Sequence, residues 1–144
     1  MRRMMIVALA LLVLTAGLTY AVLVDVWQTS NTVSVGHKSL MVTDENGVAL
    51  TSVDWGNFWE TGQSKTVKFN LTVVGSETVN IHWNVTDLPS CFNLTLATTN
   101  GNNWAANTII RKQPGETVQC TATLTLLNYQ EDSFSFTINF YASK

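Results

Sequence analysis

Side chains able to do catalytic or metal chemistry are few and scattered in this sequence. Histidine occurs only at His37 and His82, which lack the close spacing that places two metal ligands on one helix face. Acidic residues adjoin each other only at 44–45 and 131–132, in turn-like segments where a calcium site is the one alternative to consider. Neither a phosphate-binding glycine loop nor a Gly-x-Ser-x-Gly motif is present. We therefore expect no cofactor, no metal and no enzymatic activity.

The two cysteines, Cys91 and Cys120, are expected to form a disulfide if the chain is exported to an oxidising compartment. The bond would close a loop of about 30 residues and contribute roughly 3–4 kcal/mol in the chain-entropy model. The alternative is two buried free thiols. Zinc is disfavoured because two cysteines and two distant histidines at these spacings form no ligand set.

Three Asn-x-Thr sequons begin at Asn70, Asn84 and Asn93. All three asparagines fall on the predicted outward faces of strands, where a glycan is sterically allowed. A glycan would also shield a surface that is poor in charge. We therefore expect glycosylation at these three positions in a host that has the machinery.

The tryptophans of the body offer a second kind of sugar chemistry, because aromatic rings can stack on sugars. Trp83 is in phase with a predicted core face, so burial is its simplest explanation. Trp55 and Trp59 lie in an aromatic-rich connection and either plug the edge of the fold or form a sugar-binding platform, together with Trp104. A secreted or membrane-anchored carbohydrate-binding module is therefore the alternative from a different functional class.

The composition excludes several partners. Only 12% of the 144 residues are charged, against about 25% in typical soluble domains. The formal charge is −2, and no run of Lys and Arg is longer than two residues. A nucleic-acid partner needs a basic surface and is not expected, and the same holds for a basic patch that binds anionic lipid. The length suits one domain with an N-terminal appendage.

The N-terminus reads as an export signal. Arg2 and Arg3 precede an uncharged apolar run over residues 4–18, and Thr19-Tyr20-Ala21 supplies the small residues of a cleavage site after Ala21. We expect a signal peptide over 1–21, an N-terminal arm over 22–35 and a folded domain over 36–144. The alternative extends the apolar run to Val24, about 21 residues, which can cross a membrane as a retained helix. In the first case the protein is extracellular or on the cell surface, and meets the membrane only during export.

The body predicts an all-β fold, because apolar and polar residues alternate along most of it. The two clearest strands, 66–73 and 79–86, are expected to form an antiparallel pair, and Asn46-Gly47 predicts a hairpin between strands 37–43 and 48–54. Further strands are expected over 92–96, 118–126 and 134–140, with a weak one over 104–111. Seven or eight short strands indicate an antiparallel β-sandwich of jelly-roll or Ig-like type.

The arm itself has a strand pattern, with β-branched Val22, Val24 and Val26 on one face. Once the signal peptide is removed, such a strand is free to complete the sheet of another subunit. The predicted donor strand consists of Val22, Leu23, Val24, Asp25, Val26 and Trp27. Burial of the three valines at 1.5–3 kcal/mol each gives roughly 5–9 kcal/mol. The conformational entropy lost when the arm becomes ordered reduces this gain.

The order of these segments resembles the TasA/camelysin family of secreted fibre proteins and the similar archaeal bundling pilins. The resemblance is carried by the cleavage site Thr19–Ala21 and by four later stretches: 31–40, 63–70, 114–117 and 134–140. It implies a jelly-roll sandwich whose groove is filled by the arm of the next subunit, giving a head-to-tail homopolymer. Such a protein is a pilus or biofilm-matrix filament subunit whose main partner is itself, with glycans as further partners. The runner-up is a type IV-like archaeal pilin that keeps residues 4–26 as a core helix.

Overall fold

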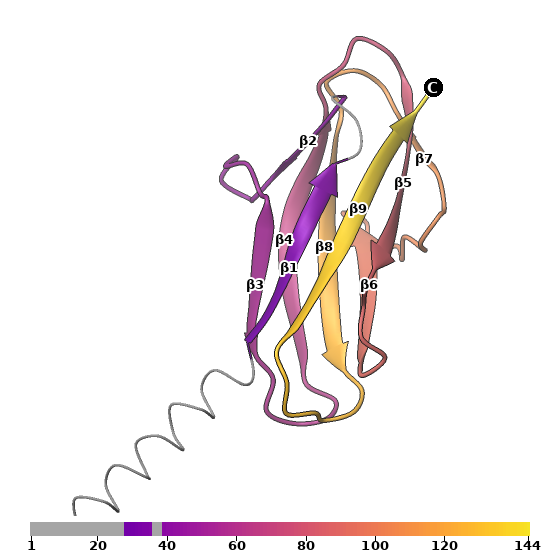
Figure 1. Ribbon diagram of the computed structural model, residues 1–144. Coiled ribbons are helices and arrows are strands. Elements are labelled where there is room, and N and C mark those ends of the chain that lie inside the picture. The colour runs from indigo at the N-terminus through magenta and orange to yellow at the C-terminus, as the bar shows by residue number, and fades with distance from the viewer. Residues whose placement is uncertain (1–27, 36–38) are drawn as a thin grey trace, which may run out of the picture.

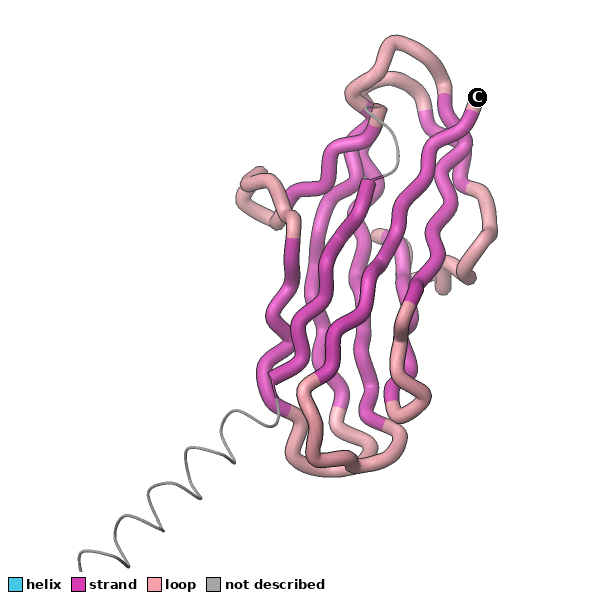
Figure 2. Tube along the Cα trace, viewed as in Figure 1, coloured by secondary structure: helices cyan, strands magenta, loops and turns pink. Residues whose placement is uncertain are grey.

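The protein folds as a sandwich of two β-sheets (Figure 1). The computed structural model describes residues 28–35 and 39–144. Strands and connecting loops make up this part of the chain, and none of it is helical (Figure 2). Within those residues there is accordingly no helix that has the length and apolarity to cross a membrane. The all-β prediction is confirmed.

Each sheet combines strands that are distant in the sequence. The five-stranded sheet has the order β3 (Ser52–Asn57), β1 (Gln28–Val35), β9 (Phe134–Ser143), β5 (Val79–Thr86) and β7 (Ile110–Lys112). The four-stranded sheet has the order β2 (Leu40–Thr43), β4 (Ser64–Val73), β8 (Thr117–Leu126) and β6 (Phe92–Thr98). Odd-numbered strands form one sheet and even-numbered strands the other. Every connection between successive described strands therefore crosses from one sheet to the other.

This crossing contradicts the predicted pairing of residues 66–73 with 79–86. β4 pairs with β2 and β8, whereas β5 pairs with β7 and β9 in the opposite sheet. The alternation in both strands was interpreted correctly, since each buries one face. It reports only which side chains face the core, and two strands facing each other across a sandwich show the same pattern as two neighbours in one sheet.

The predicted hairpin at Asn46-Gly47 exists only as a turn. Gly47 has a φ of +82° and donates its backbone N–H to the Asp44 carbonyl at 3.1 Å. Beyond the turn, Thr43 and Ala49 form a single antiparallel bridge, and the chain then leaves for the other sheet. The predicted return strand 48–54 is therefore wrong as a partner of 37–43, and only its residues 52–54 lie in a strand. β3 starts at Ser52 and continues through Trp55, which the sequence placed in a connection.

The core lies between the two sheets and is built from the predicted inward faces. Confirmed buried positions in β4, β5, β6, β8 and β9 are Phe69, Leu71, Val73, Val79, Ile81, Trp83, Phe92, Leu94, Leu96, Val118, Cys120, Ala122, Leu124, Leu126, Phe136, Ile138 and Phe140. The sheets meet at aromatic contacts such as Phe69 with Phe140, whose ring centroids are 5.5 Å apart. The sandwich therefore holds together by burial of these alternating apolar side chains.

The segment 104–111 is mostly loop, and only Ile110–Lys112 pairs as β7. Its course is fixed by two tryptophans. Trp83 Nε1 donates a hydrogen bond of 2.9 Å to the Trp104 carbonyl, and Trp104 Nε1 donates one of 2.9 Å to the Thr108 carbonyl. Because Trp104 is only 3% exposed, it anchors this loop to the core.

Candidate assembly site

β1 is an interior strand of the five-stranded sheet, between the edge strand β3 and β9 (Figure 1). It pairs antiparallel with β3 from Gln28↔Asn57 to Thr32↔Ser52. It pairs parallel with β9 from Thr29↔Phe134 to Val35↔Phe140. The other strand pairs among the described residues are antiparallel. β1 and β9 are thus a parallel pair within a sheet whose other described pairs are antiparallel.

Both neighbours of β1 in the sheet depend on it for part of their hydrogen bonding. β3 and β9 do not pair with each other, so the backbone groups that face β1 depend on it for their hydrogen bonds. Without β1 the sheet would contain a groove bounded by two strand edges, which is a template for another strand. The link from β1 to β2 is short, residues 36–39, and β2 belongs to the opposite sheet.

A β-bulge sets the register at the start of β1. Thr29 lies opposite Gly56 and Ser30 opposite Asp54, so Trp55 is an extra residue of β3. Gly56 has a φ of +63°, which a residue with a Cβ rarely adopts, and its N–H donates to Asp54 Oδ1 at 2.7 Å. Trp55 is 3% exposed. The bulge in β3 is therefore held by groups of β3 itself: the Gly56 hydrogen bond to Asp54 and the burial of Trp55.

The predicted donor strand, Val22–Trp27, lies outside the described residues. The remainder of the predicted arm, residues 28–35, corresponds to β1 and is paired within its own chain. The expected boundary between arm and body after Val35 thus divides a sheet that is continuous here. Residues 22–27 are the more apolar part of the predicted arm, which is why they are the predicted donor strand. The shorter alternation Thr32-Val33-Ser34-Val35 was the available signal for β1.

The predicted Cys91–Cys120 disulfide is wrong, because both cysteines are free and buried. Cys120 lies opposite Thr98 in the β6–β8 ladder, and Cys91 precedes Thr98 by seven residues. At about 3.3 Å per residue the two positions are separated by roughly 23 Å along the strand. A disulfide needs Cα atoms within about 7 Å. Burial raises the pKa of the Cys120 thiol to about 12.

All three sequon asparagines lie on outward faces of their strands, with different surroundings. Asn93 is exposed on β6, at the edge of the four-stranded sheet. Asn70 is partly buried and donates from Nδ2 to the Asp44 carbonyl at 3.3 Å. Asn84 Oδ1 accepts a hydrogen bond of 3.0 Å from Asn139 Nδ2. Asn93 is therefore the most accessible of the three.

The sugar platform of Trp55 and Trp59 is not formed. Trp55 faces the core from β3 and is 3% exposed, whereas Trp59 is 55% exposed in the loop after β3. Trp83 and Trp104 are also buried. His82 lies on an outward face as expected and stacks on Tyr141, with ring centroids 5.0 Å apart.

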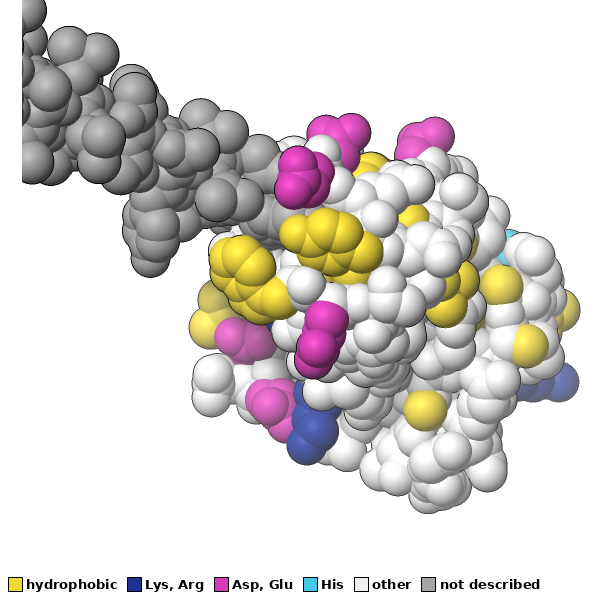
Figure 3. All heavy atoms as spheres, turned by 90° about the horizontal axis from the view of Figure 1, so that it is seen from below, with side chains coloured by type: hydrophobic (Ala, Val, Ile, Leu, Met, Phe, Trp, Pro, Cys, Tyr) yellow, Lys and Arg dark blue, Asp and Glu magenta, His cyan; other side chains and the backbone are white. Residues whose placement is uncertain are grey.

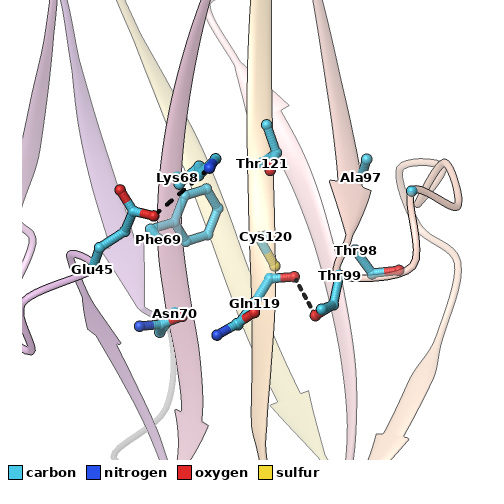
Figure 4. Close-up of a pocket in the computed structure, with 11 residues that line it drawn as sticks. Glu45, Lys68, Phe69, Asn70, Ala97, Thr98, Thr99, Gln119, Cys120 and Thr121 are labelled. Carbon is cyan, nitrogen blue, oxygen red and sulfur yellow. Dashed lines mark hydrogen bonds and ion pairs between the residues drawn. The ribbon is translucent and has the colours of Figure 1, made fainter.

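A depression of about 510 Å³ lies on the outer face of β4, β8 and β6 (Figure 4). Outward side chains of Lys68, Asn70 and Gln119 line it, with Glu45 and Gly101 on flanking turns. Glu45 and Lys68 form an exposed ion pair at 3.9 Å. Among residues 28–35 and 39–144, no three His, Cys, Asp or Glu side chains gather to hold a metal ion. The depression offers hydrogen bonds, but neither an aromatic platform nor a concentrated charge that would select a ligand.

Comparison with models of known protein families finds no match, and no curated protein is similar enough to this chain to count as a relative. Function therefore has to be inferred from the geometry of the chain itself.

Proposed function

We propose that the protein is a structural subunit of an extracellular filament, and that its subunits join by exchange of the N-terminal arm, residues 22–35. The single observation that carries the proposal is the position of β1, a parallel strand set between two strands that do not pair with each other. The sandwich is then a jelly roll with an open groove, which the arm closes. The resemblance of the sequence to TasA/camelysin proteins supports the same proposal.

Exchange costs little free energy, because the same backbone hydrogen bonds form whichever copy supplies the strand. When β1 stays in its own groove, the subunit is a closed monomer. When it enters the groove of another copy, its own groove is left for a third copy. This contact does not close on itself, so it continues as a filament. The short link 36–39 favours exchange, because short hinge loops promote strand swapping.

The proposal is tested by deleting residues 22–35 and examining purified material by negative-stain electron microscopy. We expect filaments from the chain that keeps the arm and none from the deletion variant. A synthetic peptide of residues 22–35 should bind the variant and restore its thermal stability, which distinguishes an empty groove from a misfolded protein. Filaments formed by the deletion variant would rule out arm exchange.

A further inference from the structure

Two loops at the lower end of the sandwich hold exposed aromatic side chains in fixed positions. Trp59, in the β3–β4 loop, is 55% exposed, and Tyr129, in the β8–β9 loop, is 45% exposed. The Tyr129 N–H donates to Thr61 Oγ1 at 3.2 Å, which joins the two loops. Gln63 Oε1 accepts a hydrogen bond of 2.7 Å from the Trp59 N–H. We call Trp59 and Tyr129 the aromatic patch.

Carboxylates surround the aromatic patch. Glu60, Glu131 and Asp132 lie on the same two loops, and residues 58–63 and 127–133 contain no Lys or Arg. Figure 3 views the molecule from this end and shows hydrophobic side chains among acidic ones. Desolvation, and then the Glu131 carboxylate, raise the pKa of Tyr129. An anionic lipid surface or an acidic peptide would be repelled here. A partner whose contacting side chains are apolar avoids this repulsion.

The chain enters β1 next to this patch. Gln28, the first described residue, lies opposite Asn57, two residues before Trp59. The residues that lead into Gln28 are Val22, Leu23, Val24, Asp25, Val26 and Trp27, of which all but Asp25 are apolar. An apolar segment therefore begins within reach of an exposed aromatic surface.

We propose that the aromatic patch is the docking site of residues 22–27, and that Val26 and Trp27 are the side chains that pack on Trp59 and Tyr129. Aromatic side chains bury about 150–250 Å² each, so this contact would fix the start of the arm where the ladder with β3 ends. It rests on the proposed function only in treating residues 22–27 as the beginning of the exchanged arm. The geometry is the same whether β1 comes from its own chain or from a neighbour, because the segment always precedes Gln28.

The test replaces Trp27 by p-benzoylphenylalanine in the full chain, irradiates it and maps the cross-linked peptides by mass spectrometry. We expect cross-links into residues 58–63 or 127–132. The double variant Trp59→Ala/Tyr129→Ala should lower their yield at least fivefold. Val48→Ala, a change at a residue 63% exposed in a different turn, should leave the yield unchanged.

Cross-links to lipid or detergent, cross-links confined to other parts of the body, or no cross-link at all would each overturn the docking site. Mixing isotopically heavy and light chains shows separately which copy supplies the arm. Heavy–light cross-links into the patch support both docking and exchange. Cross-links into the patch within one chain support docking and count against exchange, so the two proposals fail independently.

Discussion

At the scale of single residues, the thiols of Cys91 and Cys120 are held in the core. Desolvation raises the pKa of both, in the case of Cys120 from 9.0 to about 12. The folded state therefore favours the protonated thiol, and between pH 9 and 12 the unfolded chain binds fewer protons than the folded one. The free energy of unfolding is therefore highest, as far as Cys120 is concerned, below pH 9, and it falls as the pH rises toward 12.

We expect native protein to resist alkylation of Cys120 by iodoacetamide at pH 8, and the unfolded protein to react at both cysteines. Reducing agent should leave the melting temperature unchanged. The free energy of unfolding should fall above pH 9, and the fall should be shallower in Cys120→Ala by at most about 1.4 kcal/mol per pH unit. A native protein that alkylates as fast as the unfolded chain would contradict burial of the thiols.

The three sequon asparagines differ in how accessible their side chains are. In a host that glycosylates folded proteins, occupancy should be highest at Asn93, because it is exposed on an edge strand, while Asn70 and Asn84 make hydrogen bonds to neighbouring residues. Glycopeptide mass spectrometry measures the three occupancies. Asn93→Gln should remove most of the attached glycan, and Asn84→Gln little. The reverse order would show that accessibility in the folded state does not decide modification.

At the scale of elements, β1 depends on two ladders at once. Proline at Asn31, which pairs with both Val53 and Phe136, removes a backbone N–H from an interior strand. Asn31→Pro should lower the free energy of unfolding by at least about 2 kcal/mol in denaturant titration. Asn31→Ala keeps the N–H and serves as the matched control with a smaller effect. Equal effects of the two substitutions would mean that β1 is not paired in solution.

The same elements show what the sequence could and could not predict. Alternation in residues 66–73 and 79–86 correctly assigns Phe69 and Ile81 to the core, because burial depends only on which face a side chain occupies. It cannot choose the neighbouring strand, and β4 and β5 prove to lie in different sheets. The Asn46-Gly47 turn forms, yet the strand after it crosses the sandwich. Cys91 and Cys120 were paired from the export signal alone, without knowledge of the register between β6 and β8.

The sequence predicts a strand near the N-terminus, but not its place in the sandwich. The apolar alternation of residues 22–27 carries the prediction of an arm, whereas the strand that lies between β3 and β9 is the more polar stretch Gln28–Val35. Its place between β3 and β9 depends on pairing with strands that begin 17 and 99 residues after Val35. No local sequence pattern encodes such distant pairing. Local periodicity thus predicts a strand here but not its partners.

At the scale of the whole molecule, the proposed function depends on which copy supplies the strand between β3 and β9 of each sandwich. This can be measured directly, because Thr32 lies opposite Ser52. Directly opposite residues in an antiparallel pair have Cα atoms about 4.5–5.5 Å apart, which suits a disulfide. Thr32→Cys and Ser52→Cys, made in separate chains, can form that bond only when β1 of one molecule enters the groove of another.

The decisive measurement is non-reducing electrophoresis of the two single variants, mixed, allowed to assemble and then oxidised. Arm exchange predicts covalent species that contain one chain of each variant and are absent when either variant is oxidised alone. The double variant Thr32→Cys/Ser52→Cys should form covalent oligomers once filaments have assembled. If the mixed variants stay monomeric while the double variant cross-links only within single chains, β1 never leaves its own sandwich and the proposed assembly is wrong.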